Sequence, residues 1–79
     1  MKIKVNLFAT LVQYKPGHTG REPWIATCDE AITVTAFLET LNVPLEEVKV
    51  VFVNNVRADG DVVLKDGDRV GVFPPVGGG

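Results

Sequence analysis

Residues 66–79 read DGDRVGVFPPVGGG: a turn, an apolar strand, two prolines and three glycines in succession. The segment from Arg69 to Phe73 predicts a final strand that places its two valines on one face. The two prolines fix φ and bias the preceding residue toward extended geometry, so the chain leaves its folded body in a set direction. Gly77, Gly78 and Gly79 have no Cβ and, fully extended, reach roughly 10 Å further. We therefore expect the chemistry at the carboxylate of Gly79, on a tail that a partner's active site can admit. A frayed terminus or a cloning linker is the alternative.

The composition is that of a small soluble domain. The chain has 79 residues, of which 46% are hydrophobic and 23% charged, and its formal net charge is −2. No apolar run approaches the ~20 residues needed to span a bilayer, and no signal segment opens the chain, so we expect no membrane partner. The single cysteine allows no internal disulfide, which favours a cytoplasmic location. Basic residues are scattered without interleaved aromatics, so we expect no nucleic-acid partner.

Hydrophobic periodicity predicts both strands and a helix. Residues 2–7 alternate polar and apolar, as in a half-buried strand, and residues 8–14 then change to the spacing of a helical turn or two. Pro23 suits an edge strand or the start of a strand better than a central position. Residues 34–41 place four apolar side chains on one helical face. The predicted order is strand, strand, helix, strand, strand, strand, at residues 2–7, 22–27, 34–41, 50–53, 56–58 and 69–73.

Caps and turns support these boundaries. Thr33 is a plausible N-cap of the helix, and Asn42 supplies a left-handed C-terminal cap before a proline. Asn54 and Asn55 form a tight-turn pair that tolerates positive φ, and residues 65–68 form a second strong turn. The order predicts an α+β fold of the β-grasp, or ubiquitin-like, type. In this fold a mixed sheet of about five strands packs on one main helix. We place the domain at residues 1–76 and an extended glycine tail at 77–79.

Two segments resemble a known family of ubiquitin-related sulfur carriers. Residues 66–70 (DGDRV), 72–76 (VFPPV) and the final two glycines resemble the C-terminal signature of the molybdopterin synthase small subunit and its relatives. Residues 7–11 (LFATL) are similar to that family's segment after the first strand. The chain departs from the family at Val12 and Gln13, where an Arg-Glu pair is common, and at Gly77.

The resemblance implies a carrier and not a self-sufficient enzyme. In the family, an activating enzyme uses ATP to adenylate the terminal glycine, here Gly79, and a persulfide sulfur then replaces AMP to leave a thiocarboxylate. The tail, here including Gly77 and Gly78, enters a synthase and gives its sulfur to a pterin precursor in molybdenum or tungsten cofactor synthesis. The implied partners are an adenylating activating enzyme and the synthase large subunit. No cofactor is expected to be bound, since ATP and the persulfide donor act through the activating enzyme.

Apolar residues where the last strand ends are the predicted partner interface. We assign Phe73, Pro74, Pro75 and Val76 to it, because little core remains there for them to fill; closing the end of the core is the alternative role. Phe8 and Leu11 join this patch if the first and last strands pair in parallel. The net charge permits steering toward a basic partner surface but does not require it.

Other local motifs carry little functional signal. We expect His18 to be a solvated loop residue and Cys28 a small apolar filler, although a redox or sulfur-relay role is the alternative for the thiol. The two Asp-Gly-Asp triplets lack the spacing and the following Glu of a calcium loop, and we expect no metal site. Two further functions stay open. One is the same carrier chemistry for thiamine thiazole, tRNA thiolation or an amino acid. The other is a ubiquitin-like protein modifier that forms isopeptide bonds, or a passive interaction domain.

Overall fold

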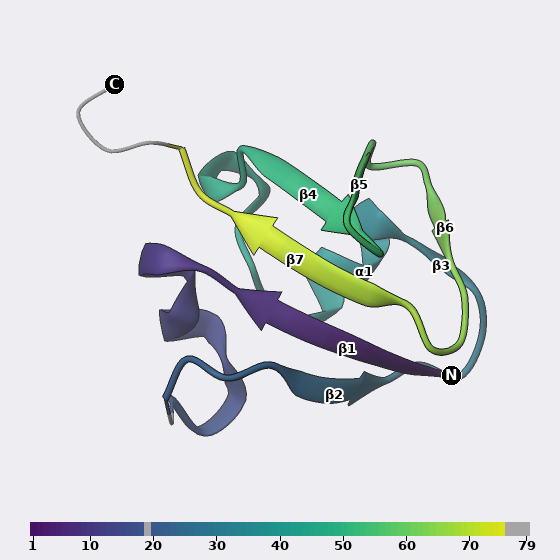
Figure 1. The fold of residues 1–79 in the computed structure, drawn as a ribbon, viewed down its shortest axis with the longest axis horizontal. Helices are drawn as coiled ribbons and strands as arrows, with labels where there is room; N and C mark the ends of the chain where they lie inside the picture. The colour runs from purple at the N-terminus through teal and green to yellow at the C-terminus, as the bar shows by residue number, and fades with distance from the viewer. Residues whose placement is uncertain (19, 76–79) are drawn as a thin grey trace.

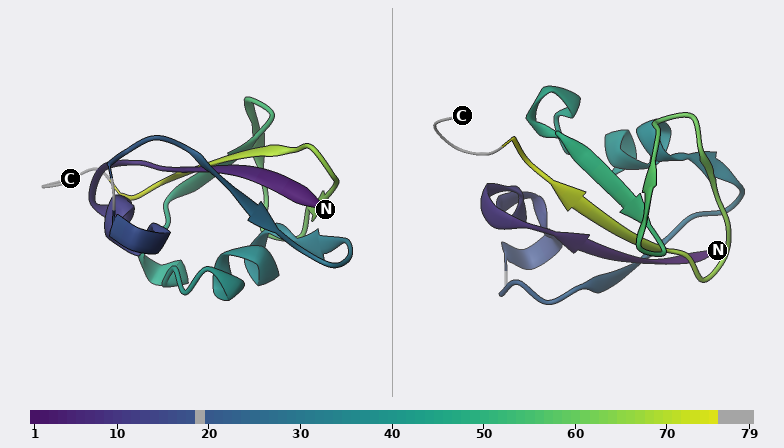
Figure 2. Two further views of the ribbon diagram at one scale, coloured as in Figure 1. Left: turned by 90° about the horizontal axis from the view of Figure 1, so that it is seen from below. Right: turned by 45° about the horizontal axis from the view of Figure 1, so that its top comes forward.

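The chain folds into a mixed sheet covered on one side by helical segments (Figures 1 and 2). The computed structural model describes residues 1–18 and 20–75. The main sheet has the strand order β2-β1-β7-β4-β5, with β1 and β7 parallel and the other neighbouring pairs antiparallel. With η for a 3₁₀ helix, the elements are β1 (Lys2–Leu7), η1 (Ala9–Tyr14), η2 (Pro16–His18), β2 (Trp24–Thr27), β3 (Ile32–Thr33), α1 (Val34–Thr40), η3 (Leu45–Glu47), β4 (Val50–Val53), β5 (Val56–Ala58), β6 (Val63–Leu64) and β7 (Arg69–Phe73).

The hydrophobic core lies between this sheet and α1. Alternate residues of β1 and β7 point into it, and Phe37 of α1 is fully buried against them. Each large apolar side chain buried in this way contributes ~1.5–3 kcal/mol to folding. The buried set is Ile3, Val5, Leu7, Leu11, Val34, Phe37, Leu38, Val43, Val51, Leu64, Val70 and Val72.

The predicted fold class is confirmed. A helix that packs across a mixed sheet, with the first and last strands paired in parallel at its centre, is the β-grasp architecture. Five of the predicted strands lie in the main sheet, and the strand that follows Pro23 is an edge strand, as expected. The domain and tail boundaries stay a prediction, because residues 76–79 lie outside the described residues.

The predicted caps also agree with the structure. The hydroxyl of Thr33 accepts a hydrogen bond from the backbone N–H of Ala36 at 3.2 Å, which caps α1. Asn42 has φ of 61°, in the left-handed region, and ends the helix. Asn54 and Asn55 have φ of 52° and 68° and form the turn between β4 and β5.

A second, two-stranded sheet was not predicted from the sequence. β3 and β6 each contain two residues and pair antiparallel beside the start of α1. Segments this short show no alternation that a sequence pattern can detect. The pairing joins the segment just before α1 to the segment just before the turn that leads into β7.

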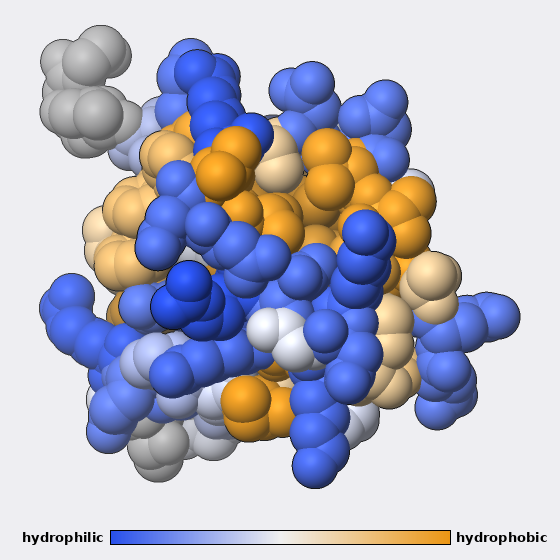
Figure 3. All heavy atoms as spheres, turned by 45° about the vertical axis from the view of Figure 1, so that its right-hand side comes forward, coloured by the Kyte–Doolittle hydropathy of each residue, from blue (hydrophilic) through white to orange (hydrophobic). Residues whose placement is uncertain are grey.

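Apolar side chains reach the surface on the side of the molecule where β5 and β6 lie (Figure 3). Val56 of β5 is 68% exposed and Val63 of β6 is 50% exposed. β5 is the outer strand of the main sheet and has three residues, so it offers little unpaired backbone to another chain. None of the helices in residues 1–18 and 20–75 has the length and apolar character needed to span a bilayer.

Replacing Thr33 by alanine tests the cap of α1. Thr33→Ala removes the acceptor for the Ala36 N–H, and we expect a loss of about 1 kcal/mol in the free energy of unfolding. Urea unfolding followed by circular dichroism measures this loss. Thr33→Ser keeps the hydroxyl and is the matched control. Equal stabilities for the two variants would show that the hydrogen bond does not stabilise the helix.

Candidate functional site

The face of the sheet opposite α1, called the outer face below, carries a cluster of aromatic rings. Side chains alternate along β1, so the burial of Val5 and Leu7 in the core leaves Phe8 on the outer face. The rings of Phe8 and Phe73 stack with centroids 4.1 Å apart and planes 4° apart. Phe52 meets Phe73 edge to face at 5.7 Å. Such pairs contribute roughly 0.5–1.5 kcal/mol each beyond the area that they bury.

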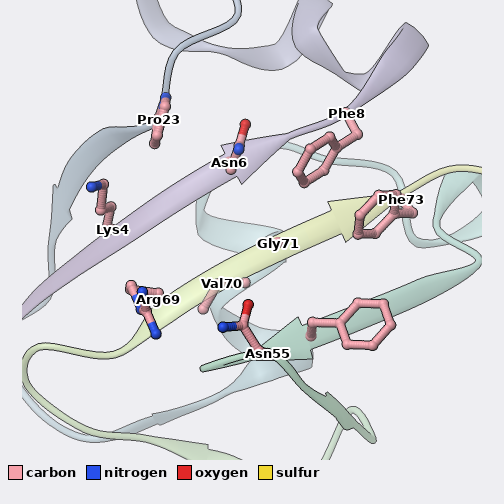
Figure 4. A pocket seen from close by; sticks show the side chains of 10 residues that line it. Lys4, Asn6, Phe8, Pro23, Asn55, Arg69, Val70, Gly71 and Phe73 are labelled. Atoms are coloured by element: carbon pink, nitrogen blue, oxygen red, sulfur yellow. The ribbon is translucent and has the colours of Figure 1, made fainter.

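A hollow of about 460 Å³ lies beside these rings on the outer face (Figure 4). Gly71 lies between the strand positions of its basic and aromatic residues, and its missing side chain lets the Phe8 ring lie close to β7. A Cβ at Gly71 would lie 3.3 Å from Cε2 of Phe8 and 3.8 Å from Cε1 of Phe73. We call this feature the sheet hollow; it is lined by Lys4, Asn6, Phe8, Pro23, Phe52, Asn55, Arg69, Val70, Gly71 and Phe73.

The sheet hollow lies at the point where the tail begins. Phe73 is the last residue of β7, and Pro74 follows it directly. Hydrogen bonds hold this end of β7 from both sides: the Phe8 N–H donates to the Val72 carbonyl at 3.0 Å, and the Lys49 N–H donates to the Phe73 carbonyl at 2.8 Å. A partner that binds the hollow therefore also holds the root of the tail.

Most of the predicted interface residues reach the surface. Phe8 and Phe73 are half-buried and share the outer face, and the parallel pairing of β1 with β7 that this depends on is confirmed. Pro74 is half-buried and Pro75 is exposed. Since Phe73 alternates with core residues and points away from α1, the structure does not give it the alternative role of closing the core. The remaining predicted positions, 76–79, lie outside the described residues.

Leu11 is a correction. It was assigned to the partner interface, but its side chain is fully buried in the core. η1 turns back across the end of the sheet, which places Leu11 beside Leu7 in the core cluster and not on the surface. The spacing of residues 7 and 11 predicted a helical turn without indicating which side of the sheet that turn would cover.

Several residues of the sheet hollow were not predicted from the sequence. Lys4 and Asn6 lie on the same face of the sheet as Phe8, and Arg69 and Gly71 lie on the same face as Phe73. The alternation of polar and apolar residues along each strand already indicated this face. Phe52 gave no such signal, because it lies in the continuous apolar run 50–53, which has no polar face.

The remaining polar contacts fix the loops around the core. The hydroxyl of Tyr14 donates to Oε2 of Glu47 at 2.6 Å and joins η1 to η3; this hydrogen bond raises the pKa of Tyr14. The Glu22 carboxylate lies 3.6 Å from Nζ of Lys15. A hydrogen bond from its own backbone N–H, and then this lysine charge, lower the pKa of Glu22.

Cys28 is half-buried and packs against the core. In residues 1–18 and 20–75, no three His, Cys, Asp or Glu side chains are grouped to hold a metal ion.

Replacing Leu11 by alanine tests its place in the core. Leu11→Ala removes a fully buried side chain, and we expect a loss of about 2–5 kcal/mol in the free energy of unfolding. Thermal and urea unfolding measure this loss. Val12→Ala, at the half-buried neighbouring position, is the control and is expected to cost less. Wild-type stability for Leu11→Ala would contradict the burial seen here.

Comparisons with known proteins agree with this fold. The family model of the Mut7-C ubiquitin domain matches residues 1–77. A protein named as molybdopterin converting factor subunit 1 from Pyrococcus furiosus is 32% identical, with a TM-score of 0.72 over 96% of this chain and 99% of that one. SAMP1 from Haloferax volcanii is 25% identical, with a TM-score of 0.72 over all of both chains. A complex of subunits 1 and 2 of molybdopterin-converting factor from Helicobacter pylori gives 25% identity and a TM-score of 0.62, also over all of both matched chains. A search of the curated proteins gives no match.

Proposed function

The chain belongs to the Mut7-C ubiquitin family, and on that basis we propose that it carries sulfur on its C-terminal glycine for the synthesis of molybdopterin. In this role it is the small subunit of a molybdopterin synthase and serves the molybdenum or tungsten cofactor. The observation that carries the proposal is the 32% identity, over nearly all of both chains, to a protein named as molybdopterin converting factor subunit 1. The Phe-Pro-Pro sequence at the root of the tail supports it.

The proposed chemistry takes place at the carboxylate of Gly79. This group is an anion and a poor electrophile at neutral pH, so it needs activation. Its oxygen attacks the α-phosphate of ATP and releases pyrophosphate to form an acyl-adenylate. A persulfide sulfur then attacks the acyl carbon and AMP leaves; a second thiol cleaves the resulting acyl disulfide and frees the thiocarboxylate. The use of ATP places this cycle in the cytoplasm.

The folded body has the features of a docking and presenting unit. Its sheet hollow offers aromatic surface to a partner, and the same strand that lines the hollow leads into the tail. Cys28 is the single cysteine of the sequence and is half-buried, and we propose that it is not the nucleophile of the reaction. We propose that the nucleophile, the metal and the phosphate-binding groups come from an adenylating activating enzyme and a synthase large subunit. The chain is then a recycled co-substrate.

Intact-mass spectrometry after incubation with ATP, a purified adenylating enzyme and a persulfide donor tests the proposal. We expect a mass gain equal to replacing one oxygen by sulfur, located in the C-terminal peptide. The modified peptide must be identified, because oxidation of Met1 or Cys28 adds one oxygen atom, which is nearly the same gain in mass as replacing oxygen by sulfur. An unmodified C-terminal peptide, with an enzyme that loads a control carrier, would count against the carrier role.

Deleting Gly79 separates folding from loading. Within residues 1–18 and 20–75, the twelve buried core residues run from Ile3 to Val72, so we expect the truncated protein to keep the wild-type unfolding midpoint. Loading should fall below detection, because the carboxylate, now on Gly78, lies one residue short of the adenylating site. The mass assay and a urea unfolding curve on the same sample measure both properties. Normal loading of the truncated chain would show that loading does not require Gly79.

Replacing Gly78 by valine tests whether the tail threads a narrow channel. The branched side chain is expected to lower kcat/KM for adenylation by about 100-fold or more, since a misplaced reacting group costs that much. Pyrophosphate release measures adenylation directly. The control is Val63→Ala, which changes an exposed valine of β6 far along the chain from the tail. Unchanged kinetics for Gly78→Val would contradict the channel.

A ubiquitin-like protein modifier is the second candidate. The similarity to SAMP1 from Haloferax volcanii, whose chain is covered in full, favours it. In this case the activated Gly79 would form an isopeptide bond to a lysine of another protein. Immunoblots against the carrier would show a ladder that disappears when Gly79 is deleted. The same carrier chemistry for thiamine thiazole, tRNA thiolation or an amino acid would instead load sulfur and leave no ladder.

A further inference from the structure

Two cations lie side by side at one end of the sheet hollow. In the parallel pairing of β1 with β7, Lys4 is opposite Arg69, and both side chains are exposed on the outer face. Figure 4 shows them at the end of the hollow away from Phe8 and Phe73. Like charges directly opposite each other on neighbouring strands destabilise a sheet. The fold therefore tolerates a repulsive pair at its central strand pairing.

The two carboxylates that precede β7 in the sequence are bonded to other groups. Asp68 accepts hydrogen bonds from Nδ2 of Asn54 at 2.9 Å and from the Lys65 N–H at 2.8 Å. Asp66 accepts one from the backbone N–H of Lys2 at 2.7 Å. Within residues 1–18 and 20–75, neither Lys4 nor Arg69 has an ion pair. Both cations are therefore available to a carboxylate from another molecule.

The spacing along β1 and β7 defines what such a molecule would need. Between the cationic pair and the stacked rings lies the pair of Asn6 with Gly71, which lines the hollow. Successive outward residues of a strand lie ~6–7 Å apart. An apolar side chain in the hollow beside Asn6 would thus have the cations about one such step away on one side and the aromatic rings on the other.

We propose that the sheet hollow binds an extended acidic segment of the protein partner, an inference that rests on the proposed function. In this segment an apolar residue and a carboxylate are two positions apart. The apolar residue lies in the hollow against the edges of the Phe8 and Phe73 rings, and the carboxylate pairs with Lys4 and Arg69. The proposal predicts a partner surface that is apolar and acidic. The chain's own net charge of −2 had instead permitted a basic partner surface. In this proposal the sheet hollow contacts the partner through its aromatic rings and favours acidic partners through its two cations.

A nucleic acid fits the same surface less well. Phe8 and Phe73 stack on each other at 4.1 Å, so they cover the ring faces that would otherwise stack on bases. Two cations in a chain of net charge −2 would neutralise few phosphates, and phosphate contacts supply most non-specific affinity. An oligonucleotide is accordingly a control in the test below.

Titration of the ¹⁵N-labelled full chain with defined peptides tests the inference. The probe is an acetylated, amidated Thr-Leu-Thr-Asp-Thr peptide, with Thr-Leu-Thr-Lys-Thr, Thr-Ala-Thr-Asp-Thr and an oligouridylate as comparisons. We expect saturable shifts of the Lys4, Gly71 and Arg69 amides with the first peptide, and affinities at least about fivefold weaker with the other two. Added salt should weaken the first peptide's binding. No saturable shift, or equal affinity for the lysine peptide, would overturn the inference; stronger binding of the oligouridylate would replace it by a nucleic-acid surface.

Charge reversal adds a readout that simple loss of folding does not give. Lys4→Glu should weaken the acidic peptide at least about fivefold while raising Tm by about 2–4 °C, because it replaces a repulsive cross-strand pair by an attractive one. Lys49→Glu is the matched control. It makes the same charge change at an exposed lysine just before β4 that lines a separate hollow beside α1, and it should leave peptide affinity unchanged. Lower stability with unchanged binding for Lys4→Glu would also overturn the inference.

The titration needs no activating enzyme, ATP or sulfur donor. A failure of sulfur loading with normal peptide binding would reject the carrier role and leave the docking surface in place. Normal loading without peptide binding would reject the docking surface alone.

Discussion

The parallel pairing of β1 with β7 is the constraint on which the rest of this structure depends. It brings residues 2–7 beside residues 69–73, from opposite ends of the chain, at the centre of the five-stranded sheet. One side of this pair supplies much of the buried core, and the other side supplies both ends of the sheet hollow. The same pairing holds the last strand as far as Val72, and β4 holds Phe73 from the other side, so the central strands set the direction in which the chain leaves the sheet.

Local patterns were enough to predict most of the fold. Alternation identified both faces of β1 and β7, the apolar spacing of α1 located the helix, and Thr33 and Asn42 marked its ends. Each of these signals depends on a few neighbouring residues, so it can be recognised in the sequence alone. The two-residue strands β3 and β6 carry no comparable signal, since their pairing depends on how distant segments meet.

The site was predicted only in part, for the same reason. Phe8 and Phe73 were identified from apolar character near the end of the last strand, but their stacking required the register of β1 against β7. That register also places Lys4 opposite Arg69, two residues separated by 65 positions in sequence, and no local pattern joins them. Leu11 shows the converse difficulty: an apolar residue close to the site in sequence belongs to the core, because η1 turns inward. Positions 76–79 were assigned from chemistry and resemblance, and the assignments there stay predictions.

Parallel terminal strands also separate the two ends of the domain. The start of β1 and the end of β7 lie at opposite ends of the sheet (Figure 1). An affinity tag, a fluorophore or a solid support attached before Met1 would therefore be held roughly the length of a strand away from Phe73, or ~17–20 Å. Molecules attached in this way to a sensor surface would have Phe73 at the end of the sheet that is farther from the attachment point. Single-molecule and surface-based measurements of partner binding can therefore use the unaltered domain.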